Sequence, residues 1–327
     1  MSEPKKCLLI CPSFFSYDSE IKNAIERNGY TVRLYDERPF RGVVGKSLVR
    51  LGLSILTNSA IKKYYKEIYD STDEHYDLLF IINPECITPD IVSYFKKKCE
   101  KVIVYMWDSF ENKINSVKLI PCADVFFTFD PHDAHNYNIK FKPLFYVPDY
   151  ICDPIDGSES YEVSFVGTAH SSRFKLVNDI AQGHSCFTFF YCPGKIVFFM
   201  KKFFFKELSG MKQNDVSFVP LNRKDVINIL KSSKAIIDIA HPKQQGLTMR
   251  TIESIACQRK LITTNKNAQN YDFFSKSNVL IVDTDINNQV ISEFLNLDHV
   301  ALPAEIYTKY FIDNWVRDII EEVPEHG

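Results

Sequence analysis

Residues 241–265 read HPKQQGLTMRTIESIACQRKLITTN, and this stretch decides the fold class. It predicts a short polar loop, a helix and then a buried strand, the succession expected of an alternating α/β protein. Arg250 and Glu253 stand three residues apart on the predicted helix. A helix N-terminus attracts anionic oxygens, an arginine adds forked donors, and a glutamate can accept from ribose hydroxyls. The stretch therefore has the parts to hold a nucleoside diphosphate.

The rest of the chain alternates strand-like and helix-like segments in the same way. Predicted strands cover residues 7–13, 31–37, 77–85, 101–108, 123–130, 161–168, 185–192, 234–240, 260–265 and 278–284. Predicted helices cover residues 18–29, 88–99, 171–182, 223–233, a segment from about 247, and 305–322, with a long amphipathic stretch at 45–69. Short apolar strands alternating with helices imply βαβ units and parallel sheets.

The composition of the sequence changes between residues 143 and 156. Three prolines and several turn residues there are typical of an interdomain linker. A chain of 327 residues is long enough for two domains with good cores. We therefore expect one domain at 1–148, a second at 149–305, and a final helix within 306–327.

Composition excludes several classes of protein. A net charge of −2 argues against a strongly basic nucleic-acid binder, so no nucleic-acid partner is expected. No apolar run approaches the roughly 18–20 residues that span a bilayer, and the apolar N-terminal segment resembles a first strand more than a signal peptide. Nine scattered cysteines without a CxxC pair suit reduced thiols and argue against a disulfide framework or a zinc site. We expect a cytoplasmic protein.

Four segments carry a resemblance to a known family. They are YMWDS (105–109), FTFDPHDAHNYNIKFKPLFY (127–146), SFVGTAHSSRF (164–174) and QGLTMRTIESIACQRKLITTN (245–265). With them the chain resembles GT-B glycosyltransferases, and locally the CgeB-like and group-1-like bacterial enzymes that build lipopolysaccharide O-antigen, capsule and related surface polysaccharides. The resemblance implies two Rossmann-like domains facing across a cleft, with the last helix crossing back to the first domain. It also implies sugar transfer without a metal or other cofactor.

The resemblance places the donor site in the C-terminal half. It implies that Glu253 binds the donor ribose, that Thr248 and Arg250 hold the diphosphate, and that Gly167 lets the phosphates approach. The predicted donor site is completed by Thr168, His170, Arg173, Gln245, Gly246 and Leu247.

Simpler interpretations of the same residues stay open. Arg250 and Glu253 could bridge each other on a solvated helix, for roughly 0.2–0.5 kcal/mol. Residues 167–173 could be a strand-to-helix turn with a serine as the N-cap. Retaining group-1 enzymes often carry a glutamate eight residues before the one matched by Glu253, and this chain has Gln245 there. We therefore expect inverting transfer, with the retaining course left open.

Two aspartates are candidates for the general base. Asp108 is the last residue of the strand 101–108, and Asp18 lies in the loop after the first strand. A carboxylate at the carboxyl end of a parallel strand faces the region where ligands bind. Both could instead cap helices, and for Asp18 the helix at 19–28 favours that interpretation.

Two patterns resemble metal sites. His132 and His135 are three residues apart, but no third ligand of the right kind is near them in the sequence. Asp283, Thr284 and Asp285 match a DxD motif, which turn and cap chemistry explains better. We expect no metal.

Two basic, apolar stretches, residues 41–66 and 195–208, allow two interpretations. Each could be a core-facing helix with a solvated lysine face. Each could also touch an anionic membrane, such as the cytoplasmic face of the inner membrane, where a lipid-linked acceptor would lie.

These observations predict a hexosyl- or related glycosyltransferase. UDP is the first carrier to expect, with GDP, dTDP and CMP open, and the acceptor would be a hydroxyl of a growing lipid-linked glycan. A nucleotide-sugar epimerase or hydrolase, and a non-catalytic binding protein of a glycan-assembly system, are the alternatives.

Overall fold

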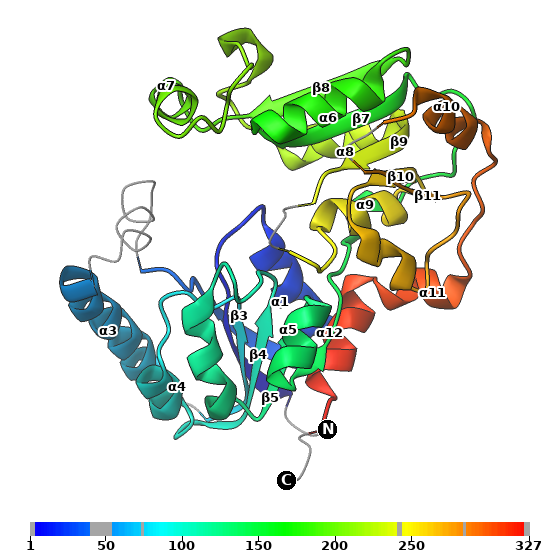
Figure 1. Ribbon diagram of the computed structural model, residues 1–327. Coiled ribbons are helices and arrows are strands. Elements are labelled where there is room, and N and C mark those ends of the chain that lie inside the picture. The colour runs from blue at the N-terminus through cyan, green and yellow to red at the C-terminus, as the bar shows by residue number, and fades with distance from the viewer. Residues whose placement is uncertain (1–3, 40–53, 73–74, 241–243, 284–285, 324–327) are drawn as a thin grey trace. The chain divides into compact units, whose positions relative to one another are not determined.

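The computed structural model describes residues 4–39, 54–72, 75–240, 244–283 and 286–323 (Figure 1). Two parallel β-sheets form its framework, which confirms the predicted α/β class. The chain divides into two compact units. The first consists of Met1–Leu144, Lys243–Gly246 and Phe311–Gly327, and the second of Phe145–Pro242 and Leu247–Tyr310. The change of unit after Leu144 lies inside the proline-containing stretch predicted as a linker.

The first unit contains a six-stranded sheet in the order β2-β1-β3-β4-β5-β6, and every neighbouring pair is parallel. The strands are β1 (Lys5–Ile10), β2 (Tyr30–Tyr35), β3 (Tyr76–Ile82), β4 (Cys99–Met106), β5 (Val125–Thr128) and β6 (Lys140–Phe141). The central strands are apolar at nearly every position because helices cover both faces of the sheet.

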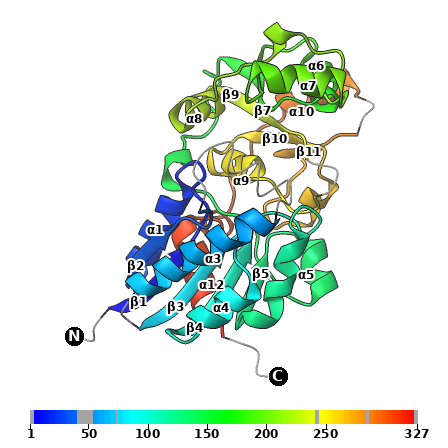
Figure 2. The same ribbon diagram turned by 90° about the vertical axis from the view of Figure 1, so that its left-hand side faces the viewer.

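Among the described residues, the helical segments around this sheet are α1 (Tyr17–Arg27), α3 (Ser54–Ser71), α4 (Pro89–Phe95), η1 (Ile114–Cys122), α5 (Pro131–Tyr137) and α12 (Ile312–Ile320). Side chains of α3 and α4 share one hydrophobic cluster with one face of the sheet. The opposite face is covered by α1 and α12, which pack against each other (Figure 2).

Trp315 fixes α12 on the sheet. Its ring is fully buried and lies edge-on to Tyr105, with centroids 4.7 Å apart. The indole Nε1 donates to the carbonyl oxygen of Pro143 at 2.9 Å. On the outer side, the Arg27 guanidinium grips the Asp313 carboxylate through two hydrogen bonds, of 2.8 and 2.5 Å. The end of the chain therefore completes the first unit.

The second unit contains a five-stranded parallel sheet in the order β11-β10-β9-β7-β8. Its strands are β7 (Tyr161–Thr168), β8 (Cys186–Tyr191), β9 (Ser233–Asp238), β10 (Lys260–Thr263) and β11 (Val279–Ile281). Its helices are α6 (Ser171–Ala181), α7 (Lys195–Phe203), α8 (Arg223–Lys231), α9 (Met249–Ala256), α10 (Asn288–Asn296) and α11 (Ala304–Lys309), with short turns η2 (Pro148–Tyr150), η3 (Gln213–Asp215) and η4 (Lys266–Asn270). α6 and α10 share one hydrophobic cluster with the strands, while α8 and α9 contact β7, β9 and β10.

One local prediction was wrong, and one of the two interpretations of Asp18 does not hold. The single helix expected at 305–322 is two helices, α11 and α12, separated at Tyr310 and Phe311. Asp18 does not cap the first helix, because α1 already begins at Tyr17 and Ser16 occupies the N-cap position. None of the described helices has the length and apolar character needed to cross a membrane.

Candidate functional site

The carboxyl ends of β7 and β9 mark the point where the second sheet reverses its strand order. β8 lies on one side of β7, while β9, β10 and β11 follow on the other. Open α/β sheets bind ligands outside the carboxyl ends of the strands at such a reversal. Gly167 and Thr168 end β7, and Thr248 caps the helix that follows β9. The structure therefore brings the two main predicted donor segments to adjacent strand ends.

The start of α6 is organised by His170 and Arg173. His170 is the N-cap, and its Nδ1 accepts the backbone N–H of Ser172 at 3.3 Å, so the cap is not a serine as predicted. The Arg173 guanidinium donates to the hydroxyl oxygen of Thr168 at 2.7 Å. Burial lowers the pKa of Arg173, and the nearby Asp238 carboxylate opposes that shift. Arg173 thus lies near the end of β9 as well as the end of β7.

Gly167 has a packing reason to be glycine. A Cβ atom at this position would lie 2.7 Å from a ring carbon of Phe165, two residues earlier on the same strand. The missing side chain therefore makes room for the Phe165 ring. The approach of phosphates to Gly167 stays a prediction.

The start of α9 is fixed by Asp238, a residue that sequence reasoning missed. Its Oδ2 accepts the hydroxyl groups of Thr248 and Thr251, each at 2.6 Å. Thr248 is also the N-cap of α9, and its Oγ1 accepts the backbone N–H of Thr251 at 3.2 Å. The one available signal was the position of Asp238 near the end of the buried run KAIIDIA.

Arg250 and Glu253 bridge each other, as the simpler interpretation expected, but the pair is largely buried and not solvated. The Arg250 Nη1 donates to Glu253 Oε2 at 2.6 Å, and Glu253 is only 4% exposed. A carboxylate has about four lone-pair sites, so this pair leaves acceptor capacity on Glu253. Binding of ribose by Glu253 stays a prediction, and it would have to occur beside this ion pair.

The first turns of α6 and α9 share a charge pattern. Neither contains an acidic residue, and each contains an arginine, Arg173 in α6 and Arg250 in α9. Carboxylates normally stabilise helix N-termini, as Asp225 can at the start of α8. A cation there is unfavourable unless an anion compensates it, and in this protein Glu253 pairs with Arg250 while the Asp238 carboxylate lies near Arg173. Two such helix starts at adjacent strand ends favour a ligand with several negative charges.

Gln245 and Gly246 belong to the first unit and are held there by a buried aspartate of the same unit, Asp130. Asp130 Oδ2 accepts the backbone N–H groups of Gln245 and Gly246, both at 2.9 Å. Gln245 and Gly246 belong to the predicted donor site, and the structure shows both of their backbone N–H groups bound to the Asp130 carboxylate. A Cβ on Gly246 would lie 2.7 Å from the Phe129 ring, so close packing requires glycine there. The Leu247 side chain is buried, so this residue could contact a nucleotide sugar only through its backbone.

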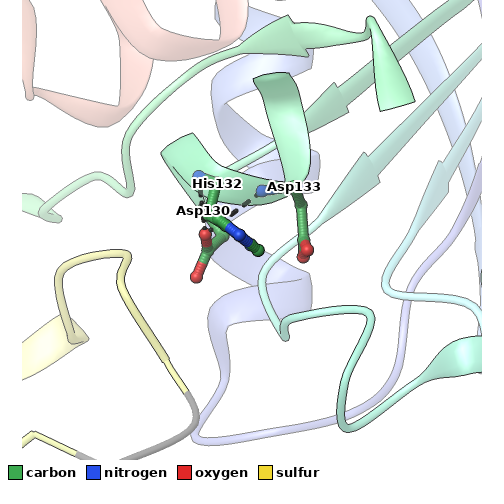
Figure 3. Close-up of side chains that lie close together, drawn as sticks. All are labelled: Asp130, His132 and Asp133. Carbon is green, nitrogen blue, oxygen red and sulfur yellow. Dashed lines mark hydrogen bonds between the residues drawn. The ribbon is translucent and has the colours of Figure 1, made fainter. Parts of the chain in front are cut away.

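Asp130, His132 and Asp133 form a cluster whose ligand-type atoms lie within 4.8 Å of one another (Figure 3). Asp130 Oδ1 accepts the backbone N–H groups of His132 and Asp133, and Asp133 Oδ2 accepts that of Phe110 at 2.7 Å. Burial raises the pKa of Asp133, and its hydrogen bond from Phe110 opposes the rise. These contacts are the capping chemistry of α5, and we infer no metal site from them.

The DxD pattern lies partly outside the described residues, which exclude Thr284 and Asp285. Asp283 is exposed and forms an ion pair with Lys266 at 2.8 Å.

Asp108 is positioned at the carboxyl edge of the first sheet. The Asn83 amide donates to Asp108 Oδ2 at 2.9 Å, and Asn83 Oδ1 accepts the backbone N–H of Asp108 at 3.1 Å. Asn83 is buried at the end of β3 with a left-handed backbone, φ 47°. This two-point contact holds the carboxylate in one orientation while leaving it partly exposed. Sequence reasoning did not single out Asn83.

Asp18 lies in the first turn of α1 and is partly exposed. Its Oδ1 is buried and accepts no hydrogen bond within the part of the chain that the structure describes. An acceptor hydroxyl is one group that could satisfy this oxygen.

Another carboxylate in this unit, that of Glu37, is fully buried just beyond β2. Its Oε1 accepts the backbone N–H groups of Glu85 at 2.7 Å, Ile87 at 3.1 Å and also Cys86. Burial raises the pKa of Glu37 to about 7, although these three hydrogen bonds oppose the rise. Glu37 therefore anchors the loop after β3, from which Asn83 reaches Asp108.

No protein-family model and no curated protein matches the sequence. Solved structures do match the fold. Anabaena HepE in complex with UDP-glucose is 12% identical with a TM-score of 0.61, over 97% of this chain and 98% of that chain. AviGT4, a glycosyltransferase of avilamycin A biosynthesis, is 11% identical with a TM-score of 0.59, over 97% and 96%. The UDP-GlcNAc 2-epimerase of Methanocaldococcus jannaschii is 10% identical with a TM-score of 0.55, over 96% and 98%. These matches confirm the predicted GT-B fold class. At sequence identities of 10–12% they show the fold and nothing about the activity.

Proposed function

We propose that this protein is a glycosyltransferase that moves a sugar from a nucleoside diphosphate sugar, UDP-linked in the first instance, to a hydroxyl group. The observation that supports it most is the pair of helix starts at the strand reversal of the second sheet, each with an arginine and without an acid. A diphosphate would place its negative charge at the two helix N-termini, beside an Arg250 that pairs with Glu253 and an Arg173 that lies near Asp238. The fold neighbours include a structure with bound UDP-glucose, which agrees with a UDP carrier.

The chemistry would proceed by charge stabilisation at the leaving group. As the bond between the anomeric carbon and the diphosphate breaks, negative charge grows on the diphosphate oxygens. Arg173, Arg250 and the N-terminus of α9 would stabilise that charge without reorganising. Glu253 would hold the ribose, and these residues require no metal for that task.

The acceptor hydroxyl would lose its proton to a carboxylate in an inverting transfer. Asp108 is the better candidate, because Asn83 fixes its orientation and its side chain remains partly exposed. Asp18 is the second candidate. We propose a growing, lipid-linked surface glycan such as O-antigen or capsule as the acceptor, and a cytoplasmic enzyme in peripheral contact with the inner membrane.

The test begins with nucleotide binding. A ligand that binds only the folded protein raises the melting temperature of that protein. If the donor carrier is UDP, then UDP should raise the melting temperature more than GDP, dTDP or CMP does. Arg173→Ala should weaken UDP binding about ten- to hundredfold, the usual effect of removing one charged hydrogen-bond donor. Arg250→Ala would leave Glu253 buried without its ion pair, so the variant to use is Arg250→Ala combined with Glu253→Gln. Arg317→Ala, on α12 in the first unit, is the control. A panel of nucleotides without any effect on melting would overturn the donor site.

A second function, epimerisation of the nucleotide sugar, is supported by the fold match to the UDP-GlcNAc 2-epimerase. The two functions differ in their need for an acceptor. Incubation with the nucleotide sugar alone, followed by NMR of the products, separates them. An epimerase forms a new sugar without any acceptor, whereas a transferase releases nucleotide only when an acceptor accompanies the donor.

A further inference from the structure

The α7 segment, defined as residues 195–208, carries an apolar stripe that the described structure leaves exposed. The stripe has the i, i+3, i+4, i+7 spacing of a helix face that normally packs on a core. Its members are Ile196 (78% exposed), Phe199 (46%), Met200 (45%) and Phe203 (64%). Two more phenylalanines, Phe204 and Phe205, follow it and are also exposed. Contiguous exposed apolar surface of this kind marks an interaction site.

The other side of the α7 segment is anchored in the second unit. Phe198 is buried, and its ring lies edge-on to Phe218 with centroids 6.2 Å apart. Leu208 and Met211 are fully buried in the same hydrophobic cluster. The face of the helix that carries Phe198 is therefore packed on the second unit. Because that face is fixed, the apolar stripe must point outward. Figure 1 shows α7 projecting beside the end of β8.

The charge of the α7 segment is strongly positive. It contains four lysines and a single acid, Glu207, which pairs with Lys201 at 2.9 Å. Lys202 donates to the carbonyl oxygen of Met211 at 2.7 Å. Lys195 and Lys206 are exposed and belong to no ion pair among the described residues. Lysines flanking exposed aromatic side chains are the combination that anionic lipid surfaces attract.

We propose that the α7 segment docks on an anionic lipid surface. The apolar stripe would lie at the boundary between the lipid headgroups and the acyl chains, and Lys195 and Lys206 would contact lipid phosphates. A second copy of this chain fits the stripe less well, because a symmetric contact would bring two net-positive segments together. The inference deepens the proposed function, on which it rests for a lipid-linked acceptor. It assigns the membrane contact to the donor-binding unit and to named residues.

Vesicle flotation tests the proposal. Wild-type protein should float with phosphatidylcholine vesicles that contain phosphatidylglycerol, and much less with phosphatidylcholine alone. The variant Phe203→Ser/Phe204→Ser/Phe205→Ser should lose about tenfold or more in partitioning. Lys195→Gln/Lys206→Gln should lose about fivefold for each lysine on the anionic vesicles only, and added salt should reproduce that loss. Phe14→Ser/Phe15→Ser, an exposed phenylalanine pair in the first unit, is the matched control and should float like wild type.

Three results would overturn the proposal. They are failure of the wild type to bind anionic vesicles, unchanged binding by the phenylalanine variant, and a dimer in sedimentation equilibrium that this variant abolishes. Melting curves show whether each variant is folded. The flotation needs no nucleotide, so its failure leaves the donor site standing, while absence of UDP binding would refute the donor site without affecting flotation.

Discussion

Glu37 gives a quantitative prediction about pH and stability. Its ordinary pKa of 4.5 rises to about 7 in the folded protein because burial disfavours the charged carboxylate. Between these two pH values the folded state holds a proton that the unfolded chain has released. The free energy of unfolding must therefore fall as the pH rises through this window. The difference corresponds to roughly 3 kcal/mol, at about 1.4 kcal/mol for each pKa unit.

The perturbation is Glu37→Gln, which resembles the protonated acid in shape and charge. Its amide oxygen can still accept the three backbone N–H groups of residues 85–87. We expect the variant to match wild type near pH 4.5 and to become more stable than wild type, by up to about 3 kcal/mol, above pH 7. The raised pKa thus stabilises the wild type on the acid side, and that stabilisation is lost as the pH rises through about 7.

Tryptophan fluorescence during urea unfolding is a suitable assay, because Trp107 and Trp315 are the two tryptophans of the chain and both belong to the first unit. The signal therefore follows the unit that contains Glu37, even if the second unit unfolds separately. Glu67→Gln, which removes an exposed carboxylate on α3, is the control and should keep the wild-type pH slope. Parallel pH profiles for wild type and Glu37→Gln would refute the reasoning, since they would mean that Glu37 is charged throughout.

Three further predictions concern the site. Asp238→Asn should lower the free energy of unfolding by about 2 kcal/mol and weaken nucleotide binding, because it replaces the two charge-assisted hydrogen bonds from Thr248 and Thr251 by weaker ones. Chemical denaturation and nucleotide titration measure these two effects, and a variant with unchanged stability and unchanged affinity would contradict the prediction. Gly246→Ala should cost about 1–3 kcal/mol by overpacking against Phe129, as seen in melting temperature, and an unchanged melting temperature would refute the close contact. Asp108→Asn should reduce transfer about a hundredfold or more while nucleotide affinity stays constant, as product formation and thermal shift would show, and full activity would remove Asp108 as the base.

The sequence predicted the sheet elements well because their apolar runs are local. The strand expected at 161–168 has the same bounds in the structure, and the helix expected at 171–182 is one residue shorter. The error at 305–322 has a tertiary cause. The Tyr310 hydroxyl donates to Asp272 at 2.5 Å, and the Tyr310 carbonyl oxygen accepts the backbone N–H of Tyr146 at 2.8 Å. Helical periodicity carries no information about such contacts, so it could not reveal the break.

The candidate site divides in the same way. Residues in local motifs, such as Arg173 at the start of one helix and Arg250 at the start of another, could be predicted because a strand followed by a helix places them at a sheet edge. The residues that hold those motifs could not, because their partners are distant in the chain. Asp130 binds residues 115 and 116 positions later, and Glu37 binds a loop 48 to 50 positions later. A single sequence does not encode such pairings in any local pattern.

The return of α12 to the first unit limits how this protein can be dissected. A fragment that stops at Leu144 would lack Trp315 and leave the aromatic faces of Phe80 and Tyr105 open to water, so we expect it to aggregate. The second unit is almost a single uninterrupted stretch and is the better choice for separate expression. A stable version of the first unit would need its two ends of sequence rejoined by a designed loop, in the manner of a circular permutant.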